Sequence, residues 1–311
     1  MKPFLGIGLK VLSAFVFTLM SAGLKLVSAD YPTGQLVFFR SAFAILPLLV
    51  WLSWRGDLIN AVRTHNIMGH LIRGIMGSCA MFSGFAALAY LPLQDTIAIG
   101  YASPLIVVVL AALVLKETVR VYRWTAVVIG FVGVLIMLSP HLSGGALADG
   151  LSGGPAFGAL ICLVGACCSA VATIQVRRLT ASEKTGAIVL YFSILASLLG
   201  LSTVVLGWKM PDADDFALLV LIGILGGIGQ ILMTQSYRFA DTSIIAPFDY
   251  TTMIWALLLG WFVFGDLPTL TVSIGGLIVA AAGLFVIWRE RQLGLQRVRE
   301  LETASQRPAG G

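Results

Sequence analysis

Long apolar runs separated by short polar connections dominate this chain. Each run is about 20 residues long, the length at which an α-helix crosses the hydrocarbon core of a bilayer. The connections, such as residues 55–66 and 208–215, are too short to form a soluble catalytic domain. The pattern predicts an all-α membrane protein with about ten transmembrane helices, over residues 4–26, 35–54, 68–90, 94–115, 122–139, 155–176, 186–207, 216–237, 242–264 and 270–288.

The composition agrees with a lipid environment. Hydrophobic residues make up 58% of the chain and charged residues only 11%, whereas soluble domains average about 25% charged residues. The net charge of +5 comes from basic residues in the connections and the C-terminal tail, so it gives no reason to expect a nucleic-acid partner. We expect the bilayer to be the medium in which the protein functions.

The placement of lysine and arginine predicts the orientation. If the N-terminus is cytoplasmic, roughly 15 basic residues fall on the cytoplasmic side, because basic residues resist translocation. The opposite side receives only Lys25 and Lys209. The prediction is therefore that both termini are cytoplasmic. An even number of spans agrees, because it places both termini on the same side of the membrane.

The sequence also repeats itself. Residues 6–43 align with residues 158–195, which places Lys25 opposite Arg177 and Phe39 opposite Tyr191. Because the period is about 150 residues and each repeat holds an odd number of predicted spans, five, the second copy enters the bilayer from the opposite side. The prediction is two inverted five-helix repeats with a substrate site between them. The expected divisions are a first repeat, a periplasmic linker, a second repeat and a basic cytoplasmic tail, at residues 1–140, 141–154, 155–290 and 291–311.

Four motifs in this order resemble the drug/metabolite transporter superfamily, EamA type. They are FFRSAFA, LIRG, YASPLIVVVLAALVLKE and APFDYTTMIWALLLGWFVFGDLP, which begin at residues 38, 71, 101 and 246. The resemblance implies a secondary carrier of small organic solutes in a bacterial-type inner membrane, working by alternating access. The layout is similar to the riboflavin and S-adenosylmethionine uptake branches, which implies a heteroaromatic solute. Export of an amino acid or a drug by the same family remains the alternative.

Motifs for other chemistry are absent from the sequence. It has no phosphate-binding loop, no H-E-x-x-H helix and no G-x-S-x-G elbow. The four cysteines have neither metal-ligand nor disulfide-framework spacing. We therefore expect no enzyme activity, cofactor or metal. A membrane scaffold or assembly factor without flux is the alternative of a different class, and a homodimer stays open.

Asp249 is the polar residue that most needs an explanation. It lies about seven residues inside a predicted span, where a carboxylate costs roughly 2.5 to 3.5 kcal/mol. Its side chain is too short to reach the headgroups, so it must be paired, protonated or facing water. We expect it to recognise a polar or cationic part of the solute or to carry a coupling proton. Pro247 beside it, and Pro104 in the equivalent span, predict helix interruptions near the midplane.

The buried cations divide into two groups. Arg40 lies about six residues into the second span, roughly 9 Å along a helix. Both outward snorkelling and a role in a cavity are open for it, and the resemblance favours the cavity because an arginine is typical of the FFR motif. Lys10 and Arg73 lie nearer the ends of their spans, so we expect them to snorkel. The complete predicted site is Arg40, Tyr101, Asp249, Tyr250, Trp255, Gln175, Gln235 and Tyr191.

Overall fold

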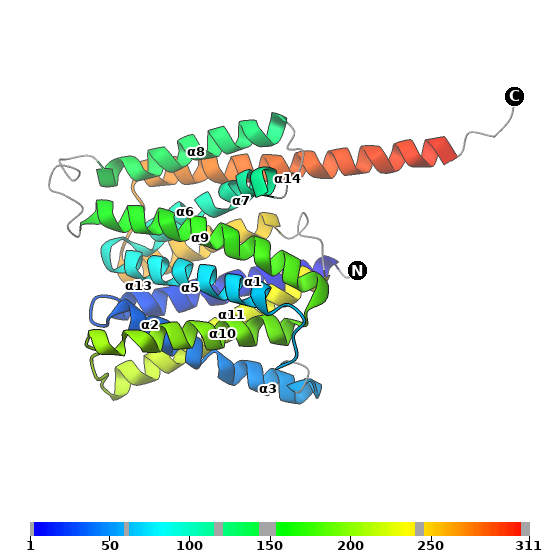
Figure 1. Ribbon diagram of the computed structural model, residues 1–311. Helices are drawn as coiled ribbons and strands as arrows, with labels where there is room; N and C mark the ends of the chain where they lie inside the picture. The colour runs from blue at the N-terminus through cyan, green and yellow to red at the C-terminus, as the bar shows by residue number, and fades with distance from the viewer. Residues whose placement is uncertain (1–2, 59–61, 115–120, 143–153, 240–245, 306–311) are drawn as a thin grey trace, which may run out of the picture.

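The structure is a computed structural model that describes residues 3–58, 62–114, 121–142, 154–239 and 246–305 (Figure 1). These residues form helices and connecting turns, with no strand among them. The helices of the first half are α1 (Pro3–Val27), α2 (Thr33–Ala42), α3 (Ile45–Arg55), α5 (Ile67–Tyr90), α6 (Leu93–Gly100), α7 (Ala102–Val114) and α8 (Val121–Leu142). The second half contains α9 (Pro155–Ser182), α10 (Thr185–Leu201), η1 (Ser202–Leu206), α11 (Ala213–Phe239), η2 (Ala246–Tyr250), α13 (Thr251–Phe264) and α14 (Leu270–Ser305).

The all-α prediction is confirmed, and several helices are suited to a bilayer. In the described part of the chain, 6 helices are long and apolar enough to cross a membrane. Shorter apolar helices cover Trp124–Ser139, Phe248–Phe264 and Leu270–Val286. The count of ten spans and the inversion of the halves stay predictions. Most of the predicted linker, residues 143–153, lies outside the described residues.

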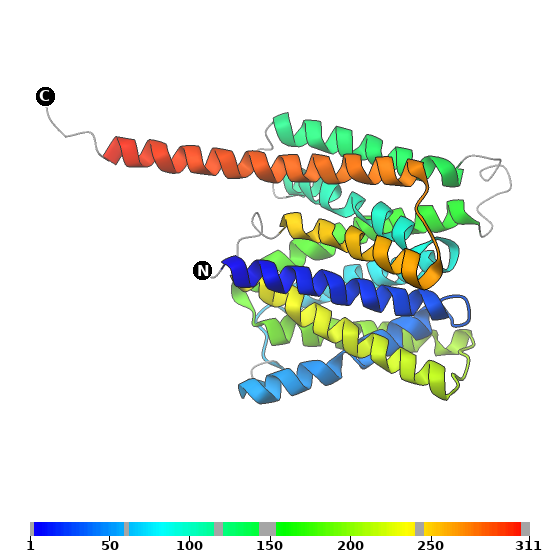
Figure 2. The ribbon, with the colours of Figure 1, turned by 180° about the vertical axis from the view of Figure 1, so that it is seen from behind.

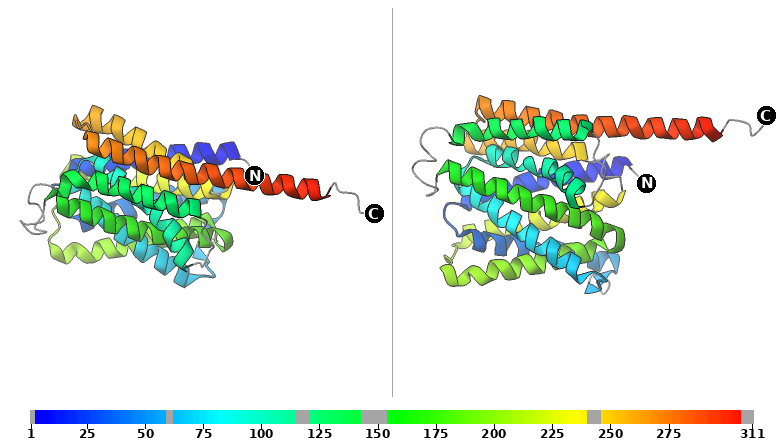
Figure 3. Two further views of the ribbon diagram at one scale, coloured as in Figure 1. Left: turned by 90° about the horizontal axis from the view of Figure 1, so that it is seen from above. Right: turned by 45° about the horizontal axis from the view of Figure 1, so that its top comes forward.

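The bundle is built from helix pairs that are far apart in the sequence. Helix α5 packs along α9, α1 along α11, and α8 along α14. Figure 3 shows α8 and α14 as neighbours along one edge of the bundle, and Figure 2 shows α1 beside α11. Glycine permits the close α8–α14 contact, because a Cβ added at Gly133 would lie 2.8 Å from the carbonyl oxygen of Gly275. The long pairs hold the halves of the sequence against each other.

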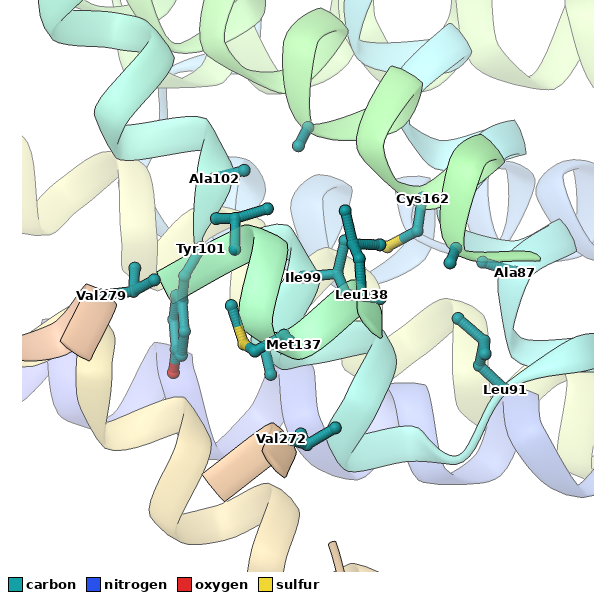
Figure 4. Close-up of a cluster of buried hydrophobic side chains, with 14 of the residues drawn as sticks. Ala87, Leu91, Ile99, Tyr101, Ala102, Met137, Leu138, Cys162, Val272 and Val279 are labelled. Carbon is teal, nitrogen blue, oxygen red and sulfur yellow. The ribbon is translucent and has the colours of Figure 1, made fainter. Parts of the chain in front are cut away.

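Two large apolar clusters fill the interior. One contains Tyr101, Ala102, Met137 and Val279, which Figure 4 shows together where α6, α7, α8 and α14 meet. The other joins the later part of α1 to α2 and α11, through side chains such as Leu24, Leu36 and Ile222.

Helix α14 extends beyond the rest of the molecule. It runs for 36 residues from Leu270 to Ser305, so the predicted span 270–288 and most of the predicted tail 291–311 form one continuous helix. Its far end projects past the bundle on the side where the N-terminus also lies (Figure 1). Both ends of the described chain are therefore at the same end of the bundle.

Candidate functional site

A cavity of about 350 Å³ lies within the bundle. Its walls come from α1, α2, α5 and α6 of the first half and from α9, α10 and α11 of the second. Small residues on the facing helices α5 and α9 leave the space open, among them Ala80, Gly84, Gly165, Ala166 and Ser169. The volume lies within the range of about 300 to 1,000 Å³ that is typical of small-molecule sites.

Two arginines that line this cavity have unsatisfied guanidinium groups. Arg40 of α2 is 4% exposed and Arg73 of α5 is 6% exposed. Nε and Nη1 of both side chains find no hydrogen-bond partner in the part of the chain that the structure describes. Each guanidinium carbon lies over the ring of Phe192, at 5.5 Å from the ring centroid for Arg40 and 4.0 Å for Arg73. Phe192 of α10 thus supports both cations without neutralising them.

Glycines make room for the two guanidinium groups. A Cβ added at Gly226 would lie 2.9 Å from Nε of Arg40. A Cβ added at Gly77 would collide with Nη1 of Arg73 and approach the ring of Phe192 to 2.9 Å. Glycine at positions 77 and 226 therefore leaves the space that the two guanidinium groups occupy.

Asp249 is paired with Lys10. The Nζ atom of Lys10 lies 2.6 Å from Oδ1 of Asp249. Lys10 also donates to the hydroxyl of Tyr237 at 3.4 Å and lies 5.0 Å from that ring's centroid. The Lys10 side chain is only 4% exposed, whereas that of Asp249 is 40% exposed. Neither Lys10 nor Asp249 lines the cavity, but Tyr237 does, so the Lys10–Tyr237 contact connects the ion pair to the cavity wall. Of the three explanations predicted for Asp249, the structure shows pairing.

The snorkelling expected of Lys10 and Arg73 does not occur. Both side chains are buried; that of Lys10 contacts a carboxylate and that of Arg73 lines the cavity. The position of a residue along a span gives its depth. It does not give the direction around the helix in which the side chain points, and here that direction is inward.

Corresponding tyrosines of the two halves meet at the helix interruptions. Helix α6 ends before Tyr101 and α7 begins at Ala102, two residues before Pro104. In the second half the 3₁₀ helix η2 contains Pro247 and ends at Tyr250. The two tyrosine rings lie 5.1 Å apart, and the Tyr101 hydroxyl is 2.5 Å from Oγ1 of Thr252. The predicted prolines thus flank a contact between the halves.

The remaining predicted residues do not line the cavity. The hydroxyl of Tyr191 donates to the carbonyl of Val62 at 2.8 Å, and its ring packs against His70. Trp255 makes an edge contact with Phe15, with ring centroids 5.0 Å apart. Gln175 and Gln235 are half-buried. Of the eight predicted binding residues, Arg40 lines the cavity, and Asp249 is connected to the cavity wall through Lys10 and Tyr237.

Polar contacts connect the helices at both ends of the bundle. At the end that carries the N-terminus, the Glu183 carboxylate accepts from Thr64 at 2.9 Å and from the N–H of His65 at 2.8 Å. Burial alone would raise the pKa of Glu183, but these hydrogen bonds and nearby His70 outweigh it and hold the pKa below the usual 4.5. These contacts fasten the segment before α5 to the turn between α9 and α10.

At the opposite end, the α1–α2 connection is fastened to the start of α11. The hydroxyl of Tyr31 donates to Asp215 at 2.6 Å, and that hydrogen bond, with burial and the surrounding carboxylates, raises the pKa of Tyr31 to about 12. Gln35 donates to the carbonyl of Lys209 at 2.7 Å and accepts from its N–H at 3.1 Å. Similar contacts thus hold each end of the bundle.

Sequence reasoning missed Arg73, Phe192 and Tyr237 as parts of the site. Arg73 lies in the LIRG motif, and the position of this charged residue inside a predicted span could have identified it as a candidate. Phe192 and Tyr237 are aromatic residues in apolar spans, and nothing in the sequence distinguishes them from packing residues. Within the described residues, no group of three His, Cys, Asp or Glu side chains could hold a metal ion.

Comparisons with known proteins place these features in a family. The EamA-like transporter family matches residues 4–139 and 156–289. The chain is 29% identical over 279 residues to the pseudopaline exporter of Pseudomonas aeruginosa, covering 89% of this chain and 94% of the exporter. It is 28% identical over 283 residues to the riboflavin transporter of Rhizobium johnstonii, covering 90% of each.

Two further comparisons extend the picture. The chain is 24% identical over 283 residues to the S-adenosylmethionine uptake transporter of Rickettsia prowazekii, covering 89% of this chain and 92% of that transporter. A crystal structure that is 19% identical superposes with a TM-score of 0.63 and covers 91% of this chain and 98% of its own, which shows a shared fold. This chain therefore belongs to the EamA-like transporter family of the drug/metabolite transporter superfamily and is a multi-pass membrane protein.

Proposed function

We propose that this protein is a secondary transporter that moves a small organic metabolite through the cavity between the halves of its sequence. The observation that carries the proposal is the cavity itself, about 350 Å³ in volume, lined by both halves and connected through Tyr237 to the Lys10–Asp249 pair. A cavity between apolar helices that also holds two cationic side chains, Arg40 and Arg73, is suited to an organic solute with a polar group. The named relatives support a transport role.

Alternating access would use the two ends of the bundle in turn. The pairing of α1 with α11 corresponds, after exchange of the repeats, to the pairing of α9 with α5. This correspondence and the Tyr101–Tyr250 contact support two inverted five-helix repeats that rock about the cavity. In this proposal the Glu183 contacts open when one side is exposed, and the Tyr31–Asp215 contact opens when the other is.

We further propose an inner-membrane location with both termini cytoplasmic, as the basic residues of the connections indicate.

The proposed solute is a heteroaromatic metabolite of the riboflavin or S-adenosylmethionine kind. Two of the relatives are named for uptake of these compounds, and Phe85, Phe192 and Met81 provide apolar surface in the cavity. Export of an amino acid or drug is the alternative within the family, and it is supported by the relative that is named an exporter.

Filling the cavity tests the proposal. Gly84 lines the cavity, and a Cβ added there meets nothing within 4 Å. Gly84→Leu should therefore fold and occupy the solute's space. Gly8→Leu is the matched control, because a Cβ at the exposed Gly8 on α1 also meets nothing within 4 Å. The measurement is exchange of labelled riboflavin, S-adenosylmethionine and a panel of amino acids across the membrane of proteoliposomes.

We expect the wild type and Gly8→Leu to exchange at least one of these solutes and Gly84→Leu to fall to the protein-free background. Normal exchange by a folded Gly84→Leu protein would show that the solute does not pass through this cavity. If the wild type exchanges none of the panel, a scaffold or assembly role without flux becomes the better explanation.

A further inference from the structure

The two cavity arginines are cations that no carboxylate of the described residues neutralises. An arginine carries five N–H donors and stays charged at any physiological pH. Burying such a group without partners is expensive, and buried polar groups in native proteins almost always have one. Arg40 and Arg73 are each more than nine-tenths buried, and their Nε and Nη1 atoms lack partners among the described residues. The two positive charges also repel each other.

In the described part of the chain, no carboxylate forms an ion pair with either arginine. Asp249 is bound to Lys10 at 2.6 Å. Glu183 is held at one end of the bundle by Thr64 and His65. Phe192 offers its π face to both guanidinium groups, but a cation–π contact adds no negative charge.

We propose that Arg40 and Arg73 bind an oxyanion group of the transported solute, a carboxylate or a phosphate. The guanidinium fork matches both groups, because it can donate two parallel N–H bonds to their oxygens. This proposal rests on the transport function proposed above and narrows its solute to one that carries a carboxylate or a phosphate, as S-adenosylmethionine and amino acids do and riboflavin does not. The charged group would lie at the two arginines, and the body of the solute would lie along the small residues of α5 and α9, such as Ala80, Gly84 and Ala166.

Such a site discriminates strongly against neutral analogues. A neutral solute of the same shape would leave two buried guanidinium groups unsatisfied, and sites built to pair a polar group reject analogues that lack it. Riboflavin and riboflavin 5′-phosphate provide one test pair, since they differ by a phosphate. The pair 3-phenylpropionate and 3-phenylpropionamide differs by the charge of a carboxylate at nearly constant shape. The two pairs separate phosphate from carboxylate recognition.

The experiment measures binding of these four compounds to purified protein in detergent, by titration and by the shift in thermal midpoint. The variants are Arg40→Gln and Arg73→Gln. Arg177→Gln is the matched control, because Arg177 lies at the exposed end of α9 and its loss changes the net charge equally. We expect at least one anion to bind the wild type and the control, and its neutral partner to bind roughly 10- to 100-fold more weakly.

Each cavity variant should weaken binding of that anion by a similar factor, and its ligand-free thermal midpoint should not fall below that of the wild type. Equal binding of the charged and neutral members of both pairs would overturn the proposal. So would arginine variants that melt earlier but bind the anion normally, because that result assigns the arginines to structure alone. Exchange of a neutral solute that Gly84→Leu blocks and both arginine variants leave intact would refute the anion site while the transport function stands.

Discussion

Two groups of buried cations lie in the same membrane-embedded bundle, and the protein treats them differently. Lys10 has a carboxylate at 2.6 Å and a tyrosine hydroxyl at 3.4 Å. Arg40 and Arg73 have an aromatic ring and no acceptor for their Nε and Nη1 atoms among the described residues. All three side chains are at most 6% exposed, so burial alone does not explain the difference. The charge of Lys10 is compensated within the protein, and we propose that the solute compensates the charges of Arg40 and Arg73.

The two members of the Lys10–Asp249 pair differ in their exposure to solvent. The lysine is almost fully buried, and the aspartate side chain is 40% exposed. Removing the aspartate therefore leaves a buried cation with only Tyr237 as a partner, while removing the lysine leaves a carboxylate that water can reach. The consequences of the two substitutions should differ for this reason.

The largest expected effect is that of Asp249→Asn on stability. Breaking a buried ion pair from one side costs about 3 to 5 kcal/mol, and we expect the lower end here. Lys10→Met should cost clearly less, and the double variant should recover much of the loss. Unfolding of the purified proteins in detergent, by heat or denaturant, provides the measurement. Equal stability of Asp249→Asn and the wild type would mean that the pair does not neutralise Lys10.

The same aspartate variant tests proton coupling. If Asp249 carries the coupling proton, folded Asp249→Asn protein should still exchange solute but should no longer respond to a pH gradient across proteoliposomes. If it binds a cationic part of the solute, its affinity should fall at every pH at which the carboxylate is ionised. A variant that keeps normal affinity and a normal pH response would exclude both roles.

A smaller effect is expected at Glu183, a carboxylate outside the spans that is compensated by hydrogen bonds. Glu183→Gln should cost about 1 kcal/mol near neutral pH. Because its folded pKa is below 4.5, Glu183 stabilises the fold fully above pH 4.5, and this contribution is lost as the pH falls through the folded value. The stability difference between wild type and variant should therefore shrink below pH 4.5. A difference that is independent of pH would contradict the pairing.

The smallest effect on stability is expected at the unpaired arginines. In the absence of solute, Arg73→Met should change the free energy of unfolding by no more than about 1 kcal/mol, with stabilisation as the favoured sign. Loss of the contact with Phe192 destabilises the variant, whereas removal of a buried charge without a described partner stabilises it. Thermal midpoints of ligand-free protein measure the outcome. A loss as large as that of Asp249→Asn would mean that Arg73 has an internal partner and that the contrast between the two groups is false.

The sequence predicts the helices better than it predicts the site. Runs of apolar residues give the spans because their length and composition are dictated by the bilayer. Asp249 and Arg40 could be singled out because their polarity contradicts their depth. The directions of Lys10 and Arg73 could not be predicted, because an apolar span has no polar face that reveals which side is inward.

Other parts of the site depend on contacts between distant segments. Tyr191 was expected in the site, yet its hydroxyl binds the carbonyl of Val62 near one end of the bundle. Phe192, the next residue, supports both arginines. The two side chains differ by one helical step of about 100°, and only the packing of α10 decides which of them faces the cavity.

The central claim is that solute reaches a positively charged cavity between the halves, and the charge selectivity of a cavity cysteine tests it most directly. Ser169→Cys is nearly isosteric and lines the cavity. It would be studied in a background with Cys79, Cys162, Cys167 and Cys168 replaced by alanine. The reagents are methanethiosulfonates that carry either a sulfonate or a trimethylammonium group, and their reaction rates are compared in proteoliposomes at low ionic strength.

After correction for intrinsic reactivity, we predict that the anionic reagent modifies the cysteine at least about tenfold faster than the cationic one. This preference should disappear when Arg40 and Arg73 are both replaced by glutamine. Equal rates with both reagents, a faster cationic reaction, or no modification from either side of the membrane would contradict the account.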